Sequence, residues 1–177
     1  MNTQINKVMD IKKIKTEFII SKVPNHKKHK TILLNLINKM PVNSYDQISK
    51  TDWNLPKDME RKYLQYFYTN ICNDVMDQQK KYFKSENWEI INGWFQQYEK
   101  DSFHVYHNHR NANFTNVYFL ELPDLKFKTS IKIGKKKYDY DVKEGQVITF
   151  PAHLLHCSKS NGNLRKTIIS FNSHFIY

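Results

Sequence analysis

The spacing of apolar residues changes once along this chain, near Glu86, and that change limits the fold more than any other feature. Before Glu86, apolar side chains recur every three or four residues, and after it they alternate every second residue. Residues three or four apart share one face of an α-helix, whereas residues two apart share one face of a β-strand. The sequence therefore predicts helices followed by strands, an α+β fold whose β half closes into a small barrel or jelly roll.

Two helices are expected in the first half. Residues 28–39 carry apolar residues at helical spacing and end before Pro41, where the preceding residue disfavours a helix. Residues 56–83 form a longer amphipathic pattern, and Pro56 suits the first turn of a helix. The apolar residues of this longer pattern are Met59, Tyr63, Tyr66, Phe67, Ile71, Val75 and Met76. We interpret this stripe as a surface that packs on the core.

Short runs rich in Ile, Val, Phe, Tyr and Thr predict strands in the second half. They cover residues 87–98, 103–109, 114–121, 127–133, 137–142, 146–150 and 165–172. Gly134, followed by lysines at 135–137, marks one turn, and the pair Glu144-Gly145 marks another. No internal repeat or linker divides the sequence, so one folded domain is expected.

The net charge is strongly positive, with 28 Lys and Arg against 17 Asp and Glu among 177 residues, or +11. The lysines are scattered rather than gathered in one stripe, which favours a role in solubility. They are densest at the N-terminus and in the turn at 135–137, away from the histidines considered below. Nucleic acid is therefore the less favoured partner, and no zinc-finger or helix-turn-helix pattern supports it.

The two cysteines, Cys72 and Cys157, lie far apart in the sequence and are expected to remain reduced thiols. No apolar run approaches the ~18 residues of a membrane span. Residues 1–15 lack the apolar block of a signal peptide. These features predict a cytoplasmic protein that does not enter a membrane.

Histidines are concentrated in the β half, where five of the eight lie between residues 104 and 156. His107 and His109 are two apart on an expected strand, so both imidazoles can reach one cation. A His-x-His pair alone is more often solvent-facing than metal-binding. A third ligand must come from elsewhere in the chain. His104 should point to the opposite face of a regular strand, as a surface or hydrogen-bonding residue.

Further motifs follow the histidine pair in a fixed order. Residues 115–119 form an expected strand, residues 145–151 (Gly-Gln-Val-Ile-Thr-Phe-Pro) lead to His156 in an expected loop, and the last strand ends in Ser170-Phe171-Asn172. This order resembles that of the 2-oxoglutarate/iron(II) oxygenases, and most closely a family common in bacteriophages and marine bacteria. Thr51-Asp52-Trp53 and Trp94-Phe95 extend the resemblance to about residues 48–175.

The resemblance implies a double-stranded β-helix, which is a jelly-roll or cupin-like core, with N-terminal supporting helices. It implies an oxygenase domain over residues 48–177, helical to about 83 and β-helical from about 87, preceded by an N-terminal extension and helix over residues 1–47. If the protein is phage-encoded, the resemblance implies the host cytoplasm as its location.

The resemblance also implies that His107, His109 and His156 bind catalytic iron(II). Three ligands leave coordination positions open for 2-oxoglutarate and O2. Most of the superfamily uses Asp or Glu as the second ligand, but no histidine here has a carboxylate two residues on. Either His109 is that ligand, giving three neutral imidazoles, or a carboxylate such as Asp139 or Asp141 comes from a neighbouring strand.

In the superfamily a basic residue nine or ten positions after the distal histidine binds the remote carboxylate of 2-oxoglutarate. Arg165 and Lys166 occupy these positions, and only one should reach the cofactor because neighbours on a strand face opposite ways. Arg is the commoner residue, whereas Lys166 shares its strand face with the polar Ser170 and Asn172. Tyr118 and Asn172 are further candidates for cofactor binding, and His153 is a candidate for the mouth of the site.

The implied function is a 2-oxoglutarate- and Fe(II)-dependent dioxygenase that hydroxylates an unknown substrate. Relatives include prolyl hydroxylases, so a protein side chain is the first expectation for the substrate. One alternative is a non-catalytic cupin-like protein that holds zinc or nickel. Another is a basic nucleic-acid-binding protein whose histidines are incidental.

Overall fold

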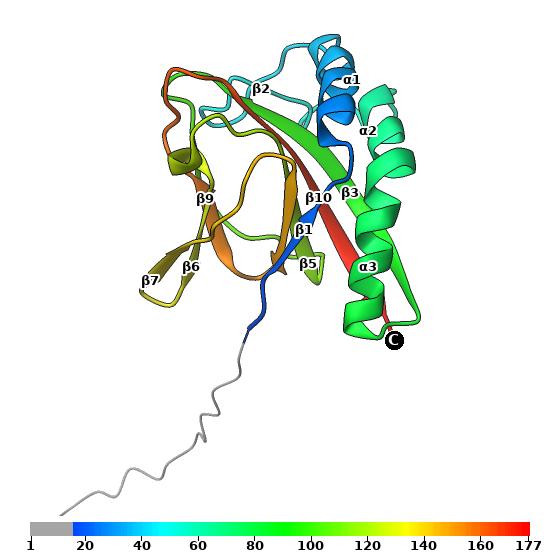
Figure 1. Ribbon diagram of the computed structural model, residues 1–177. Helices are drawn as coiled ribbons and strands as arrows, with labels where there is room; N and C mark the ends of the chain where they lie inside the picture. The colour runs from blue at the N-terminus through cyan, green and yellow to red at the C-terminus, as the bar shows by residue number, and fades with distance from the viewer. Residues whose placement is uncertain (1–15) are drawn as a thin grey trace, which may run out of the picture.

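Two antiparallel sheets face each other in the computed structural model, which describes residues 16–177 (Figure 1). The larger sheet has the order β1 (Ile19–Lys22), β8 (Gln146–Pro151), β5 (Phe114–Glu121), β10 (Lys166–Ile176), β3 (Asn87–Tyr98) and β2 (Lys50–Thr51). The smaller sheet has the order β4 (His104–His107), β9 (Leu155–Ser158), β6 (Thr129–Ile133) and β7 (Lys136–Asp139). This arrangement is that of a jelly-roll core.

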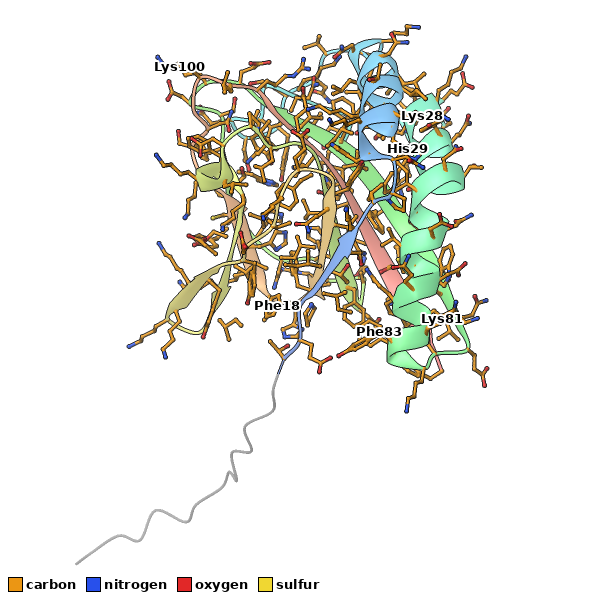
Figure 2. All side chains as sticks on the ribbon, in the orientation of Figure 1. Phe18, Lys28, His29, Lys81, Phe83 and Lys100 are labelled. Carbon is orange, nitrogen blue, oxygen red and sulfur yellow. The ribbon has the colours of Figure 1, made fainter. Side chains whose placement is uncertain are left out.

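Apolar side chains fill two separate cores, one on each side of the larger sheet. Successive residues of β5 alternate between them because side chains on a strand point to opposite faces. Tyr118 and Leu120 belong to the core under the helices, whereas Val117 and Phe119 belong to the core between the sheets. Side chains fill the space between the sheets, while Lys28 and Lys81 project outward from the helical side (Figure 2).

The helices cover the outer face of the larger sheet (Figure 1). Where the sequence predicts a helix over residues 28–39, α1 runs from His26 to Asn38. The expectation of one helix over residues 56–83 is wrong at its start, because α2 begins at Lys62 (Lys62–Phe67). Pro56 lies in a turn instead: the guanidinium of Arg61 donates to the carbonyls of Pro56 and Met59, which holds this stretch out of a helix.

A π-helical turn, η1 (Tyr68–Cys72), separates α2 from α3 (Asn73–Phe83). Buried residues 63, 67, 71 and 75 are four apart, and each such step advances about 40° around an α-helix of 3.6 residues per turn. A wider turn takes up that drift. The apolar stripe therefore stays against the sheet along the whole segment.

All seven expected strands are present: β3 and β5 have the predicted bounds, and the other five have shifted ends. Three further strands are not predicted by the sequence. A 3-10 turn, η2 (Leu125–Phe127), replaces the start of the strand expected at residue 127. The unexpected strands are β1, β2 and β9. Strand β1 pairs with β8, so part of the expected N-terminal extension belongs to the larger sheet. The domain boundary at residue 47 remains a prediction, and residues 1–15 lie outside the described residues.

The two thiols that the sequence predicts to be reduced, Cys72 and Cys157, are free in the structure, and both are buried. Within residues 16–177, no helix combines the length and the apolar character that crossing a membrane requires.

A buried carboxylate joins the Thr51-Asp52-Trp53 segment to the rest of the fold. One oxygen of Asp52 accepts from Arg61 Nε at 2.9 Å and from the Tyr63 hydroxyl at 2.6 Å. Its other oxygen accepts from the Phe95 N–H of β3 at 3.0 Å. Burial raises the pKa of Asp52, although all three donors act to lower it. A buried ion pair such as Asp52–Arg61 adds little net stability when it is intact. Removing one member is costly, because its partner is left buried and unpaired.

We therefore expect Asp52→Ala to lower the free energy of unfolding by about 3–5 kcal/mol, because Arg61 then loses its carboxylate inside the protein. The control is Asp58→Ala, at an exposed position, with an expected change within about 0.5 kcal/mol. Urea unfolding followed by far-ultraviolet circular dichroism measures both. Equal stabilities of the two variants would show that Asp52 is not an anchor.

Candidate metal centre

Three histidines meet between the two sheets. His107, His109 and His156 each offer a ring nitrogen, and the three atoms lie within 4.8 Å of one another. His107 on β4 lies directly opposite His156 on β9 in the antiparallel register. His109 follows β4, where its N–H donates to the Ala152 carbonyl at 2.9 Å. In the described part of the chain, this is the one cluster of three or more His, Cys, Asp or Glu residues with such spacing.

The Nδ1 atom of each of the three imidazoles forms a hydrogen bond with a carbonyl or amide oxygen, and such an oxygen can only accept. His107 Nδ1 donates to the Val105 carbonyl at 2.9 Å, and His156 Nδ1 donates to the Leu154 carbonyl at 3.1 Å. His109 Nδ1 donates to Asn172 Oδ1 at 2.6 Å. These contacts fix the tautomers and leave the Nε2 lone pairs free. A divalent metal binds neutral imidazoles of this kind.

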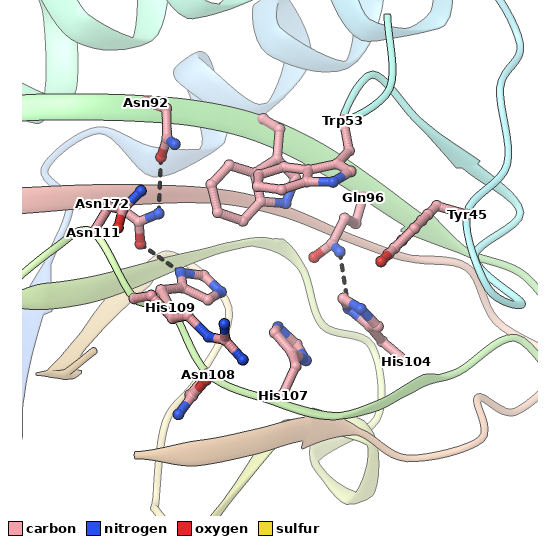
Figure 3. A pocket seen from close by; sticks show the side chains of 12 residues that line it. Tyr45, Trp53, Asn92, Gln96, His104, His107, Asn108, His109, Asn111 and Asn172 are labelled. Carbon is pink, nitrogen blue, oxygen red and sulfur yellow. Dashed lines mark hydrogen bonds between the residues drawn. The ribbon is translucent and has the colours of Figure 1, made fainter. Parts of the chain in front are cut away.

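Asn172 was expected to bind the cofactor, and the structure places it against the imidazole of His109. Its Nδ2 donates to Asn92 Oδ1 at 2.8 Å, which orients its Oδ1 toward His109 (Figure 3). Asn172 therefore holds a candidate ligand in position. It also lines the outer pocket beside the histidines.

Burial lowers the pKa of all three candidate ligands. Desolvation is the largest cause for His107, His109 and His156. Nearby imidazoles lower the pKa of His156 and of His109 further. The rings are thus held neutral, the form that has a lone pair for a metal.

His104 does not point away from the site as a regular strand would require. The pairing of β4 with β9 is irregular between His104 and His107, so the two rings stack with centroids 4.0 Å apart. His104 Nδ1 contacts Gln96 Nε2 at 3.2 Å, and Nε2 lies 3.3 Å from Asp46 Oδ2. Burial lowers its pKa to about 3. A neutral His104 that donates to Asp46 and accepts from Gln96 satisfies both contacts.

The carboxylates proposed as alternatives to His109 lie elsewhere. Asp139 is on β7 and forms an ion pair with Lys159 at 2.7 Å. Asp141 is exposed, and neither residue lines a pocket with the histidines. His109, not a carboxylate, completes the cluster that the structure brings together.

An outer pocket of about 280 Å³ opens over the histidines (Figure 3). Its lining is aromatic and amide-rich, and among the described residues it includes one cation and no carboxylate. The lining residues other than histidine are Tyr45, Trp53, Trp94, Asn92, Gln96, Asn108, Asn111, Asn172 and Arg110. His153, expected at the mouth, is exposed and lies outside this lining.

A second, inner chamber of about 20 Å³ lies deeper between the sheets and is lined by the three histidines together with Tyr98, Thr129, Ser158 and Ser170. Lys166 lies behind it, almost fully buried. Its ammonium donates to the Phe127 carbonyl at 2.7 Å and to the Ser158 hydroxyl, and it lies 4.1 Å from the centre of the Tyr98 ring. No carboxylate of residues 16–177 forms an ion pair with Lys166. Burial lowers its pKa to about 7.

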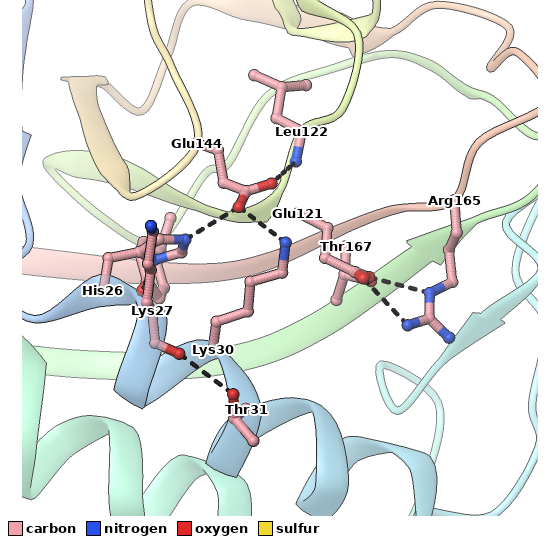
Figure 4. A network of polar contacts seen from close by, with 10 residues as sticks. His26, Lys27, Lys30, Thr31, Glu121, Leu122, Glu144, Arg165 and Thr167 are labelled. Carbon is pink, nitrogen blue, oxygen red and sulfur yellow. Dashed lines mark hydrogen bonds and ion pairs between the residues drawn. The ribbon is translucent and has the colours of Figure 1, made fainter.

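Two other candidates for cofactor binding face away from the histidines. Arg165 forms a two-point ion pair with Glu121, at 2.9 and 3.1 Å (Figure 4). Tyr118 lies under the helices, and its hydroxyl hydrogen-bonds to His26 Nδ1 at 2.7 Å. Val117 lines the inner chamber, so its strand neighbour Tyr118 must face the other way.

The sequence does not point to several residues that lie around the histidines. Asp46 and Gln96 carry no local signal, because their contacts come from loops and strands distant in sequence. Trp53 and Trp94 lie in the segments that carry the resemblance, but the sequence does not show that their rings meet. In the structure the two rings are 4.4 Å apart at one wall of the outer pocket.

No protein-family model matches this chain, and no curated protein matches it in sequence. Solved structures match it over most of its length. A viral collagen prolyl hydroxylase from Paramecium Bursaria Chlorella virus-1, in complex with 2-oxoglutarate, has TM-score 0.60 and 13% identity, covering 90% of this chain and 96% of its own. A prolyl hydroxylase from Trichoplax adhaerens, in complex with a hypoxia inducible factor peptide fragment, has TM-score 0.60 and 15% identity, covering 88% and 82%.

HygX from Streptomyces hygroscopicus, with nickel and 2-oxoglutarate bound, has TM-score 0.69 and 8% identity, covering 92% of this chain and 84% of its own. At such low identities these likenesses establish the architecture. The chain has the fold of solved 2-oxoglutarate/iron(II) oxygenases.

Proposed function

We propose that this protein is a 2-oxoglutarate- and iron(II)-dependent dioxygenase that hydroxylates an organic substrate. The observation that carries the proposal is the placement of two complementary groups next to each other between the sheets. Three imidazoles with free Nε2 atoms face the inner chamber, and a buried ammonium without an acidic partner lies behind it. A metal store needs the first group, whereas a metal enzyme that binds a dicarboxylate needs both.

The imidazole set fits iron(II). Three nitrogen ligands on one side of a metal leave positions open for further oxygen ligands. Iron(II) bound there would supply the oxidative chemistry that couples decarboxylation of 2-oxoglutarate, with O2, to hydroxylation of the substrate. His107, His109 and His156 would hold the metal, and Asn172 would keep His109 aligned. Three neutral ligands leave one more positive charge than a set with a carboxylate, which strengthens attraction for an anionic cofactor.

Lys166 fits the remote carboxylate of 2-oxoglutarate. An ammonium has three donors, and two are used by Phe127 and Ser158. The third is bonded to no oxygen or nitrogen of the described residues, and the Tyr98 ring lies 4.1 Å from the ammonium. A carboxylate in this low-dielectric environment would offset the cost of burying the charge. The inner chamber has room for about one water molecule, so neighbouring side chains must shift to admit the cofactor.

The outer pocket supports a neutral substrate, and a protein side chain is our choice. Asn and Gln side chains offer both a donor and an acceptor, which matches the amides of a peptide backbone. The aromatic wall of Trp53 and Trp94 offers an apolar surface for a ring or methylene group. A lysine or arginine side chain is disfavoured because no carboxylate of the described residues lines the pocket. The matched prolyl hydroxylase with a bound peptide fragment is consistent with this choice.

Finer parts of the proposal rest on the sequence. The motif order supports membership of the oxygenase family common in bacteriophages and marine bacteria, and a reduced cysteine pair suits a cytoplasmic location. A cupin-like store for zinc or nickel is the competing function, because three histidines suit those metals too. The unpaired ammonium of Lys166 favours the oxygenase.

The direct test measures the metal in protein purified without added metal, then succinate release from 2-oxoglutarate with Fe(II) and air, in the presence of a peptide library. We expect iron bound at one equivalent and succinate release that some peptides stimulate. Release must stop under nitrogen. Tight zinc binding with no succinate under any condition would support the metal store.

We expect His156→Ala to abolish stoichiometric Fe(II) binding while the fold is retained, because only two ligands would remain. The matched control is His153→Ala, which removes an exposed imidazole three residues away. Anaerobic iron titration and circular dichroism measure binding and folding. Undiminished iron binding by the His156 variant would rule out the assignment.

We expect Lys166→Met to weaken 2-oxoglutarate binding about 10- to 150-fold, because it removes a charge-assisted contact worth about 1.5–3 kcal/mol. Arg165→Met is the matched control, since it removes the neighbouring charge but breaks only the ion pair with Glu121. Its affinity for 2-oxoglutarate should stay near that of the parent. Calorimetric titration of the metal-loaded protein compares the two, and the reverse order of affinities would assign the contact to Arg165.

A further inference from the structure

The outer face of the smaller sheet carries an exposed tyrosine on β4, Tyr106, with two lysines of β6 and β7 reaching over its ring. Strand neighbours alternate, so Tyr106 lies on the face opposite His107, and Lys132 lies on the face opposite the buried Ile131. Lys132 Nζ is 5.8 Å and Lys137 Nζ is 5.9 Å from the centre of the Tyr106 ring. The Tyr106 side chain is 36% exposed, so its ring is accessible from solvent.

The two lysines are an unfavourable pair in the free protein. Lys132 on β6 and Lys137 on β7 are direct partners in the antiparallel register, and like charges placed opposite each other destabilise a sheet. The neighbouring acid on β7, Asp139, is taken by Lys159 at 2.7 Å. Across residues 16–177, neither Lys132 nor Lys137 takes part in an ion pair. An anion bound between them would remove the repulsion.

Position separates this lysine pair from the other lysines. Lys28, Lys81 and Lys100 project from separate edges of the molecule, as expected of charges that confer solubility (Figure 2). The β6–β7 hairpin instead extends from the body on the side away from the helices (Figure 1). Lys135 and Lys136 at its turn are exposed and add to the same charge.

We propose that this face, defined by Tyr106, Lys132 and Lys137, binds a single strand of nucleic acid. A base would stack on the Tyr106 ring while flanking phosphates contact the two lysines, the combination by which proteins hold unpaired strands. The acidic side chains of a peptide would satisfy the lysines but carry no ring that could stack on Tyr106. A duplex keeps its bases stacked inside the double helix, where they cannot stack on Tyr106. The surface is on the opposite side of the sheet from the histidines, so it stands or falls independently of the proposed oxygenase activity.

The test is fluorescence anisotropy of the full chain with a labelled oligothymidylate of about 15 nucleotides, at ~50 and ~200 mM salt. We expect binding that weakens steeply with salt. Lys132→Glu with Lys137→Glu should lower the affinity at least about tenfold and reduce the slope of log K against log salt by about 1.4, the value for two phosphate contacts on a single strand. The control is Lys28→Glu with Lys81→Glu, which makes the same charge change and should leave the slope unchanged.

The tyrosine is tested separately. Tyr106→Ala should lower the affinity about fivefold or more, and Tyr106→Phe should keep it, because stacking needs the ring and not the hydroxyl. Tyr82→Ala removes another exposed tyrosine, on α3, and should have no effect. If the double glutamate variant does not fold, Lys132→Gln with Lys137→Gln makes the same comparison.

Three results would overturn the proposal. The first is no salt-dependent binding at ~50 mM salt. The second is an equal loss of affinity in the two double variants, which would mean that net charge alone acts. The third is competition by polyglutamate or by a duplex of the same sequence as strong as competition by the single strand, which would assign the face to an acidic protein or to duplex DNA.

Discussion

The alternation of side chains along antiparallel strands is the constraint on which the rest of this structure depends. A strand with a different environment on each face of its sheet must present alternate residues to the two environments. On β10, Lys166 reaches the inner chamber region while its neighbour Arg165 pairs with Glu121 on the other side. On β5, Val117 faces the histidines and Tyr118 faces the helices. The smaller sheet likewise places the candidate metal ligands His107 and His156 on one face and the surface of Tyr106, Lys132 and Lys137 on the other.

Burial with few acidic partners gives the cavity its chemical character, since Asp46 contacts His104 and no carboxylate of the described residues pairs with Lys166. In a low-dielectric interior the imidazoles favour their neutral form, and the ammonium of Lys166 loses its proton more readily than an exposed lysine does. The acids that could neutralise them form ion pairs elsewhere, as Glu121 does with Arg165 and Asp52 with Arg61. The cavity therefore combines lone pairs for a cation with a donor for an anion. A cation and an anion bound together would therefore satisfy these groups better than either ion bound alone.

The sequence predicted seven of the strands well, because alternation along a strand depends on short-range spacing. His107, His109 and His156, singled out through the spacing of one pair and the family resemblance, lie together in the structure. The prediction from sequence failed where a distant contact overrides a local pattern. Arg61 holds Pro56 in a turn that propensity alone would make helical. An irregularity between β4 and β9 turns His104 toward His107, although regular alternation placed it on the other face. Strand β9 lacks the β-branched residues that mark a strand, so His156 was expected in a loop.

The central position of β10 also has a consequence for biosynthesis. It pairs with β3 on one side and β5 on the other, yet it follows both in the chain. A ribosome must therefore complete residues 166–176 before the larger sheet can close, and until then β3 and β5 expose unpaired edges. Since Asn172 belongs to this strand, His109 gains its partner only at that final stage. A nascent chain therefore cannot complete this arrangement around the histidines before β10 has been translated.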